Sequence, residues 1–204
     1  MDILQELKAN QYLLAVSKLQ PVEKIKMLHS LGQRDFGENY IQEALKKIET
    51  LKDLDIQWHL IGPVQKNKVK FLKNHFAYIH SIDSLELATR ISEKATEVGF
   101  SQKVFLQINL SGESSKSGFS VDELKKTWPL LQKLQGLKIV GLMTMPPLEN
   151  QPENNRTYFQ KLKILGQSLN LNEFSMGTSH DYKIALEEGA TWIRLGTILF
   201  GDRK

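Results

Sequence analysis

Short apolar segments alternate with longer amphipathic segments from one end of the chain to the other. The short segments are rich in β-branched and aromatic residues, as strands are, and the longer ones repeat apolar residues every three or four positions, as helices do. The predicted strands are residues 12–18, 35–39, 56–62, 77–83, 103–110, 137–145, 173–177 and 190–201. The predicted helices between them are residues 21–32, 40–51, 66–74, 85–98, 121–136, 156–170 and 181–189.

This alternation predicts an α/β fold with a parallel sheet, because parallel neighbouring strands need a helical crossover between them. Eight strand segments favour a (β/α)8 TIM-type barrel, formed by residues 1–204 as a single domain. The chain is near the lower length limit for that barrel, so its loops must be short. An open doubly wound sheet is the alternative, but no strand is followed by the GxGxxG turn that holds a dinucleotide.

Several predicted helices carry residues that are typical of helix boundaries. Pro21 and Gly32 flank the first helix, and Ser84 is placed to cap the helix that ends before Gly99. Pro129 lies inside the segment 121–136, where its missing N–H predicts a kink.

The composition is that of an ordinary globular protein, with 41% hydrophobic and 25% charged residues. The net charge of +4 comes from lysines scattered along the chain, which does not indicate nucleic-acid binding. The chain has no cysteine, which excludes disulfides and thiolate sites, and its five histidines lack metal-site spacing, so we expect no metal. The first residues form no apolar leader and no apolar run approaches about 18 residues, so we expect a soluble cytoplasmic protein without membrane contact.

Lys18 ends the first predicted strand, which is otherwise largely apolar. The carboxyl ends of the strands hold the functional side chains of a (β/α)8 barrel. An apolar pocket favours the neutral form of an amine, and a neutral amine captures carbonyl compounds as a Schiff base. The alternative is a lysine whose side chain simply extends to water at the barrel rim.

Two loops near the end of the chain favour phosphate binding. SMGTSHD, residues 175–181, combines hydroxyls with a glycine directly before a helix, whose first N–H groups have no helical partner. RLGT, residues 194–197, adds a second glycine and a threonine hydroxyl. Phosphate sites in these barrels are commonly formed by the loops after strands 7 and 8. The alternative is a helix cap and a tight turn that hold no ligand.

A lysine on one side of the barrel mouth and a phosphate site on the other fit a ligand with an aldehyde and a phosphate, as in pyridoxal 5′-phosphate (PLP). Arg194 and Gly196 share one strand face by alternation, so the guanidinium is a candidate partner of the pyridine nitrogen. An arginine there keeps that nitrogen unprotonated and makes the ring a weaker electron sink. The alternative is an ordinary ion pair, for example with Glu38.

The chain resembles the pyridoxal phosphate homeostasis family over nearly its whole length. The similarity rests on motifs in the family's order, which are AVSK at 15–18, GQRDFGENYIQE at 32–43, QWHLIGPVQKNK at 57–68, SGESSKSGF at 111–119, GLMTM at 141–145, SMGTSHD at 175–181 and, within 193–203, IRLGT, ILFG and Arg203. Several long motifs in sequence are far more specific than any one of them.

This resemblance implies a fold type III barrel without a C-terminal β domain, in which Lys18 forms the internal aldimine with PLP. It also implies that Asn39 faces the cofactor and that Arg194 approaches the ring nitrogen. The residues implied around the phosphate are Ser175, Gly177, Thr178, Ser179, Gly196 and Thr197. Lys68 and Lys116 match family lysines, but solvated surface charge explains each equally well.

Two departures from the family are visible. Thr178 stands where the family has methionine, which changes a side chain near the phosphate but keeps the backbone donors. The chain also begins about a dozen residues before the first strand, which is a shorter lead-in than family members usually have.

We therefore expect a protein that holds PLP on Lys18 and serves PLP homeostasis in the cell, with no catalytic residues of its own. Racemases need an acid and a base on opposite faces of the ring, and the second group normally comes from a further β domain for which this chain has no room. A weak amino-acid racemase is the first alternative, and a Schiff-base aldolase for a sugar phosphate is the second. Expected partners are PLP and PLP-dependent apoenzymes, without nucleic acid, and we expect a monomer.

Overall fold

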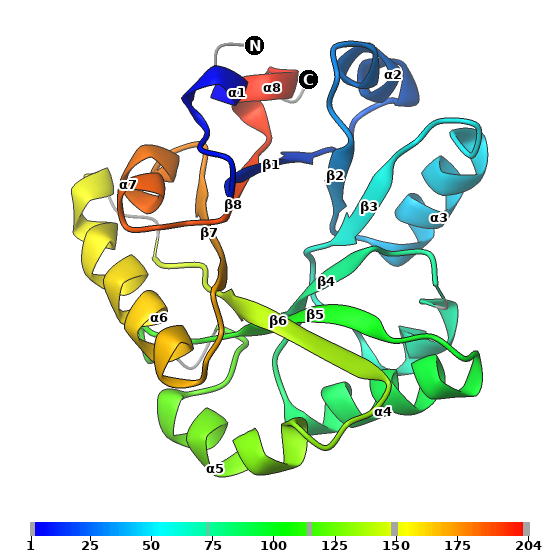
Figure 1. Ribbon diagram of the computed structural model, residues 1–204. Coiled ribbons are helices and arrows are strands. Elements are labelled where there is room, and N and C mark those ends of the chain that lie inside the picture. Colours follow the sequence, from blue (N-terminus) through cyan, green and yellow to red (C-terminus); the bar gives the residue numbers. More distant parts are fainter. Residues whose placement is uncertain (1–2, 73, 114–115, 148–150, 202–204) are drawn as a thin grey trace.

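The computed structural model describes residues 3–72, 74–113, 116–147 and 151–201. Within these ranges, eight parallel strands form a closed barrel in the order β1 to β8, and helices cover its outside (Figure 1). The strands are β1 (Tyr12–Val16), β2 (Asp35–Glu38), β3 (Gln57–Leu60), β4 (Tyr78–Ile82), β5 (Gln102–Gln107), β6 (Leu137–Met143), β7 (Glu173–Thr178) and β8 (Trp192–Leu195). The predicted (β/α)8 barrel is confirmed, and the open doubly wound sheet is wrong.

The connecting elements follow the strands in chain order. The α-helices are α1 (Ile3–Glu6), α2 (Val22–Ser30), α3 (Ile41–Thr50), α4 (Leu85–Glu97), α5 (Val121–Leu131), α6 (Arg156–Ser168), α7 (Tyr182–Glu187) and α8 (Thr197–Phe200), with 3₁₀ helices η1 (Lys66–Phe71) and η2 (Pro152–Asn155). Every helix in the described ranges is too short or too polar to span a lipid bilayer.

The strands are buried on both faces, as parallel strands covered by helices are. Alternate residues of each strand point outward and form the large core between the barrel and the helices, with Phe36 and Trp58 among them. The intervening residues point into the barrel, where a smaller apolar cluster contains Leu14, Phe105 and Met143. Polar side chains occupy much of the remaining interior, so titratable groups lie along the barrel axis.

The helix boundaries largely match the sequence signals. The Ser84 hydroxyl accepts a hydrogen bond from the Leu87 N–H at the start of α4, as predicted. Gly32 and Gly99 follow α2 and α4 with φ angles of 98° and 68°, a region that glycine adopts without strain. Pro129 lies near the end of α5, which stops two residues later at Leu131 instead of extending to residue 136.

Larger differences from the prediction concern the first strand, the predicted helix 66–74 and the last strand. The first strand ends at Val16, because the chain turns sharply after it. Within the predicted helix 66–74, Lys66–Phe71 forms the 3₁₀ helix η1, in which only Val69 is buried, so η1 lacks the apolar face that a longer α-helix needs. The last strand stops at Leu195, and the apolar residues that follow form α8, which buries Phe200. A short apolar run does not by itself distinguish strand from helix.

Candidate functional site

The carboxyl ends of the strands surround a cavity of about 340 Å³. Asn39 follows β2, Gly62 follows β3, and Met145 follows β6 at its wall, and Lys116 lies on the same wall. The Oδ1 atom of Asn39 is buried and accepts no hydrogen bond within the described residues. A buried acceptor without a donor is costly unless a ligand or water supplies one. The carboxyl end of the barrel, where the sequence predicts the ligand site, therefore contains a buried acceptor that lacks a donor among the described residues.

Lys18 lies in a tight turn at this same end of the barrel. The Gln20 N–H donates to the Ser17 carbonyl at 3.0 Å, so Lys18 and Leu19 form the centre of the turn, and Lys18 is partly buried. Leu19 has a φ of 60°, and its N–H donates to the Glu43 carboxylate at 2.6 Å. This strained conformation is held by its surroundings, as is common where a side chain must be presented in a fixed direction.

A buried cluster of charged residues contacts the turn that contains Lys18. The Lys47 ammonium donates to the Ser17 carbonyl, to Glu38 Oε1 and to Glu43 Oε1, each at 2.7 Å. Burial raises the pKa of the Glu38 carboxyl, while hydrogen bonds from Lys47 and Ser17 oppose that rise. Glu38 thus pairs with Lys47, and the alternative of an ion pair between Glu38 and Arg194 is wrong.

Arg194 points into the barrel, where it is 4% exposed. Its Nη1 donates to the Ser175 hydroxyl at 2.8 Å, and its Nη2 donates to the Thr144 carbonyl at 3.0 Å. Burial lowers the pKa of the guanidinium to about 10, and the charge of Asp181 opposes this. The group is therefore a buried cation at neutral pH, fixed by two neighbouring strands.

A chain of hydrogen bonds continues from Ser175 along the barrel axis. His80 Nδ1 lies 2.8 Å from the Ser175 hydroxyl, His59 Nδ1 lies 3.0 Å from His80 Nε2, and His59 Nε2 lies 3.0 Å from Asp35 Oδ1. Both histidines are fully buried. Burial lowers the pKa of His59 and lowers that of His80 further, and the charge of Arg194 adds to the latter effect. The chain runs from the barrel interior at Ser175 to Asp35 at the start of β2.

The loop after β7 is shaped by Gly177 and Asp181. Gly177 has a φ of 88°, and a Cβ there would lie 2.6 Å from the Ala185 Cβ, so only glycine fits. Thr178 donates to the Asp181 carboxylate through its N–H at 2.7 Å and its hydroxyl at 3.0 Å. The sequence left open a helix cap and a tight turn here; the contacts of Thr178 with Asp181 form a tight turn, whereas Asp181, at the start of α7, makes no side-chain cap hydrogen bond.

Unpaired backbone donors lie at the ends of β7 and β8. The N–H groups of Ser179, Gly196 and Thr197 donate no hydrogen bond within the described part of the chain. Thr178 and Arg194 are register partners in neighbouring strands, so the two loops are adjacent on the rim. Exposed N–H groups on adjacent loops are suited to an anion such as a phosphate.

The structure thus brings the predicted residues to one end of the barrel, with differences in detail. Ser175 is fully buried and its hydroxyl faces the interior, not the rim. Of the predicted residues, Asn39 belongs to the lining of this cavity, whereas Lys18 and the predicted residues of the two loops do not. Lys116 pairs with Glu113 at 2.9 Å, and Lys68 lies 5.6 Å from the centre of the Phe71 ring.

Sequence reasoning missed the interior chain and the ion cluster. The spacing of the histidines along the sequence says nothing about contacts between strands, and within the described residues no group of three or more potential metal ligands is found. The available signal was the residue type, because His59 and His80 are polar residues inside two neighbouring predicted strands that are otherwise largely apolar. Lys47 gave a weaker signal, as a charged residue at an otherwise apolar position of its helix.

Comparison with known proteins supports the resemblance. The family described as "Alanine racemase, N-terminal domain" matches residues 2–204. A pyridoxal phosphate homeostasis protein of Aquifex aeolicus is 44% identical over 198 residues, which are 94% of this chain and 87% of that protein. The Escherichia coli K12 protein of the same name is 36% identical over 199 residues, which are 94% of this chain and 85% of that protein.

Solved structures agree with these relatives. PipY of Synechococcus elongatus with PLP bound is 40% identical and superposes with a TM-score of 0.93 over 98% of this chain and 97% of that chain. An alanine racemase of Clostridium difficile is 18% identical, with a TM-score of 0.82 over 99% of this chain and 55% of that chain, and shares the fold. The chain belongs to the pyridoxal phosphate homeostasis protein family, built on the alanine racemase N-terminal domain.

Proposed function

We propose that this protein binds PLP covalently through a Schiff base on Lys18 and serves PLP homeostasis. The observation that carries the proposal is the position of Lys18, which lies at the same barrel mouth as the unpaired N–H donors of the β7 and β8 loops. The chain is also 40% identical to a protein that was solved with PLP bound. The names of the relatives describe the same role for those proteins.

The side chains and donors present fit the parts of this cofactor. PLP supplies an aldehyde that an amine captures, together with a ring nitrogen and a phosphate. The N–H groups of Ser179, Gly196 and Thr197, with Gly177 shaping the loop, are proposed to hold the phosphate. Asn39 offers its buried Oδ1 as an acceptor. Lys18 is held in position by the turn whose base is the Lys47 cluster.

Thr178, Ser175 and Arg194 have supporting roles in this proposal. Thr178 stabilises the loop through Asp181. Ser175 orients the Arg194 guanidinium. Ser175 remains a proposed contact on the phosphate side of the cofactor, and Arg194 remains the proposed contact of the ring nitrogen. Because an arginine does not give up its proton near neutral pH, it leaves that nitrogen unprotonated and favours holding the cofactor over turning substrates into products.

The wider role follows from this chemistry. A carrier limits the reactions of a free aldehyde with amines elsewhere, and we propose that PLP-dependent apoenzymes receive the cofactor. We further propose that the protein acts as a monomer in the cytoplasm. Lys68 and Lys116 are not assigned to the cofactor, since each has a partner of its own.

The test is an absorption spectrum of the purified protein with PLP, before and after borohydride reduction, with the modified peptide identified. We expect a visible band that reduction removes, and a label on Lys18. Lys18→Ala should lose both, whereas Lys26→Ala, which removes an exposed lysine of α2, should keep both. A band retained by Lys18→Ala would contradict the proposal.

A weak amino-acid racemase is the second candidate, favoured by the shared alanine racemase fold. Exchange of the α-proton into D2O, measured for a panel of amino acids, separates the two functions. Exchange at ordinary enzyme rates, about 1 per second or faster, would replace the carrier by the racemase. The Schiff-base aldolase finds no support in the names of the relatives.

A further inference from the structure

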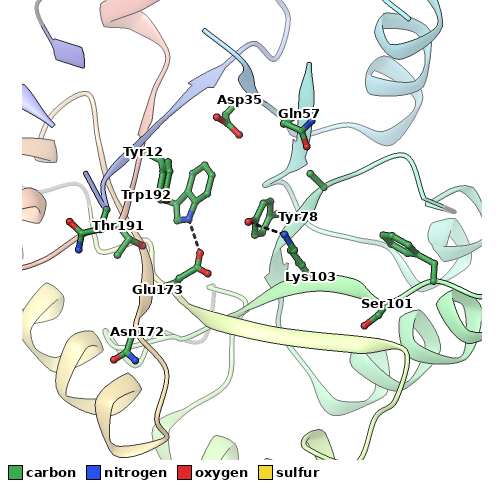
Figure 2. A pocket seen from close by; sticks show the side chains of 13 residues that line it. Tyr12, Asp35, Gln57, Tyr78, Ser101, Lys103, Asn172, Glu173, Thr191 and Trp192 are labelled. Atoms are coloured by element: carbon green, nitrogen blue, oxygen red, sulfur yellow. Dashed lines mark hydrogen bonds between the residues drawn. The ribbon is translucent and has the colours of Figure 1, made fainter. Parts of the chain in front are cut away.

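A second cavity lies at the opposite, amino-terminal mouth of the barrel and is larger, about 680 Å³ (Figure 2). The first residues of several strands line it, namely Tyr12, Asp35, Gln57, Tyr78, Glu173 and Trp192. This end of the barrel takes no part in the proposed PLP site. A cavity of this size is large enough to hold a small organic molecule.

Two carboxylates face this cavity, and one oxygen of each carboxylate is held in place by a hydrogen bond. Asp35 Oδ1 pairs with His59 Nε2 at 3.0 Å, and Glu173 Oε2 accepts from the Trp192 indole N–H at 2.9 Å. The other oxygen of each carboxylate takes part in no hydrogen bond within the described residues. Figure 2 shows both groups turned toward the middle of the cavity. Each carboxylate is thus fixed by one oxygen and presents a second oxygen without a donor among the described residues.

Aromatic rings form another part of the wall. Tyr12 stacks on Trp192 with ring centres 4.6 Å apart, and Tyr78 lies 5.3 Å from Trp192. The Lys103 ammonium lies 4.9 Å from the centre of the Tyr78 ring and 3.4 Å from its hydroxyl. This resident ammonium shows that the wall accommodates a cation on a ring face. The cavity therefore combines aromatic faces with an excess of negative charge, from two carboxylates against one ammonium.

We propose that the amino-terminal cavity binds a small organic ammonium ion. The free oxygens of Asp35 and Glu173 supply the counter-charge, and Tyr12 and Tyr78 supply the ring faces that favour an organic cation over a metal ion. Lys103 competes with the ligand for the same surroundings. This competition predicts opposite effects for the removal of an acid and of the lysine, which a merely apolar cavity would not produce.

The experiment uses the whole protein without added PLP, so it does not depend on the proposed function. Choline is the probe, and 3,3-dimethylbutan-1-ol, its neutral isostere, is the ligand control. The readout is the indole N–H signal of Trp192 in a two-dimensional NMR spectrum, identified by its loss in Trp192→Phe. Choline should shift this signal saturably with a Kd of about 1 mM, and the alcohol should not, because it lacks the charge.

Two variants sharpen the test. Glu173→Gln keeps an acceptor for the indole and should weaken choline binding about tenfold, because one of the two negative charges is lost. Lys103→Met should tighten binding several-fold, because an exposed competing cation is lost. Lys26→Met is the matched control, since it removes an equal charge outside the cavity and should leave the Kd unchanged.

The proposal is overturned if choline does not shift the Trp192 signal saturably. It is also overturned if the neutral alcohol binds equally well, or if Lys103→Met weakens binding.

Discussion

Nη1 of Arg194 lies 2.8 Å from the hydroxyl oxygen of Ser175, and this contact orders the whole interior chain. A guanidinium only donates, so the Ser175 oxygen accepts, and its own hydrogen is directed to His80 Nδ1. His80 then carries its proton on Nε2 and donates to His59 Nδ1, and His59 donates from Nε2 to Asp35. One arrangement of neutral histidines satisfies every group from the buried cation to the carboxylate.

Ser175→Ala should destabilise the protein by about 2–3 kcal/mol, because it removes a hydrogen bond from a buried charge and leaves His80 Nδ1 without a donor. Urea unfolding with an unchanged m-value measures this loss. Ser30→Ala, which removes an exposed hydroxyl that donates to Met27, should cost less than about 0.5 kcal/mol. Equal losses in the two variants would show that the interior chain contributes nothing to stability.

The protein should lose stability as the pH falls below about 6.5, the ordinary pKa of histidine. Burial lowers the pKa of His59 and His80 in the folded state, so the unfolded chain binds protons first and is favoured. Each histidine contributes a slope of about 1.4 kcal/mol per pH unit until the pH reaches its folded pKa.

His80→Gln should reduce the slope of stability against pH by the contribution of one histidine. The measurement is the urea midpoint between pH 7.5 and about 5.5, the range below the ordinary histidine pKa being the informative one. At about pH 7.5 His59 and His80 are largely neutral in both states, so that pH serves as the internal control. A wild-type stability that stays constant from pH 7 down to about 5.5 would contradict the predicted burial of neutral histidines.

Lys47→Met should destabilise the protein by about 3–5 kcal/mol, because Glu38 would keep a buried charge without its partner. Adding Glu38→Gln to this variant should restore part of the loss, since the uncompensated charge is then gone. Lys46→Met is the control, because Lys46 is the exposed neighbour on the same helix. If the double variant is no more stable than Lys47→Met, the ion pair does not account for the loss.

Gly177→Ala should lower stability by about 2–4 kcal/mol, through a left-handed backbone and a Cβ 2.6 Å from Ala185. Gly32→Ala is the matched control, because Gly32 has a φ of 98° and nothing lies within 4 Å of its added Cβ. Gly32→Ala should lower stability by about 1 kcal/mol, because it adds only the backbone strain. Unfolding midpoints measure both, and PLP binding at equal folded fraction should fall only in Gly177→Ala.

The sequence by itself determined the architecture. The order of strands and helices, the cap at Ser84 and the glycines after α2 and α4 are local signals, because turn and cap geometry depends on neighbouring residues. It also located Lys18 and the last two loops at strand ends, which a parallel barrel brings to one mouth. Boundaries failed where a short apolar run suits both strand and helix, as in residues 197–200.

Only the tertiary structure decided which polar groups meet inside the barrel. Both faces of these strands are buried, so alternation does not separate inward from outward residues in the sequence pattern. The register between strands then decides that His59 reaches His80 and that Ser175 reaches Arg194. The pairing of Glu38 with Lys47 likewise depends on how α3 packs on β2. These contacts depend on barrel closure, which no single segment encodes.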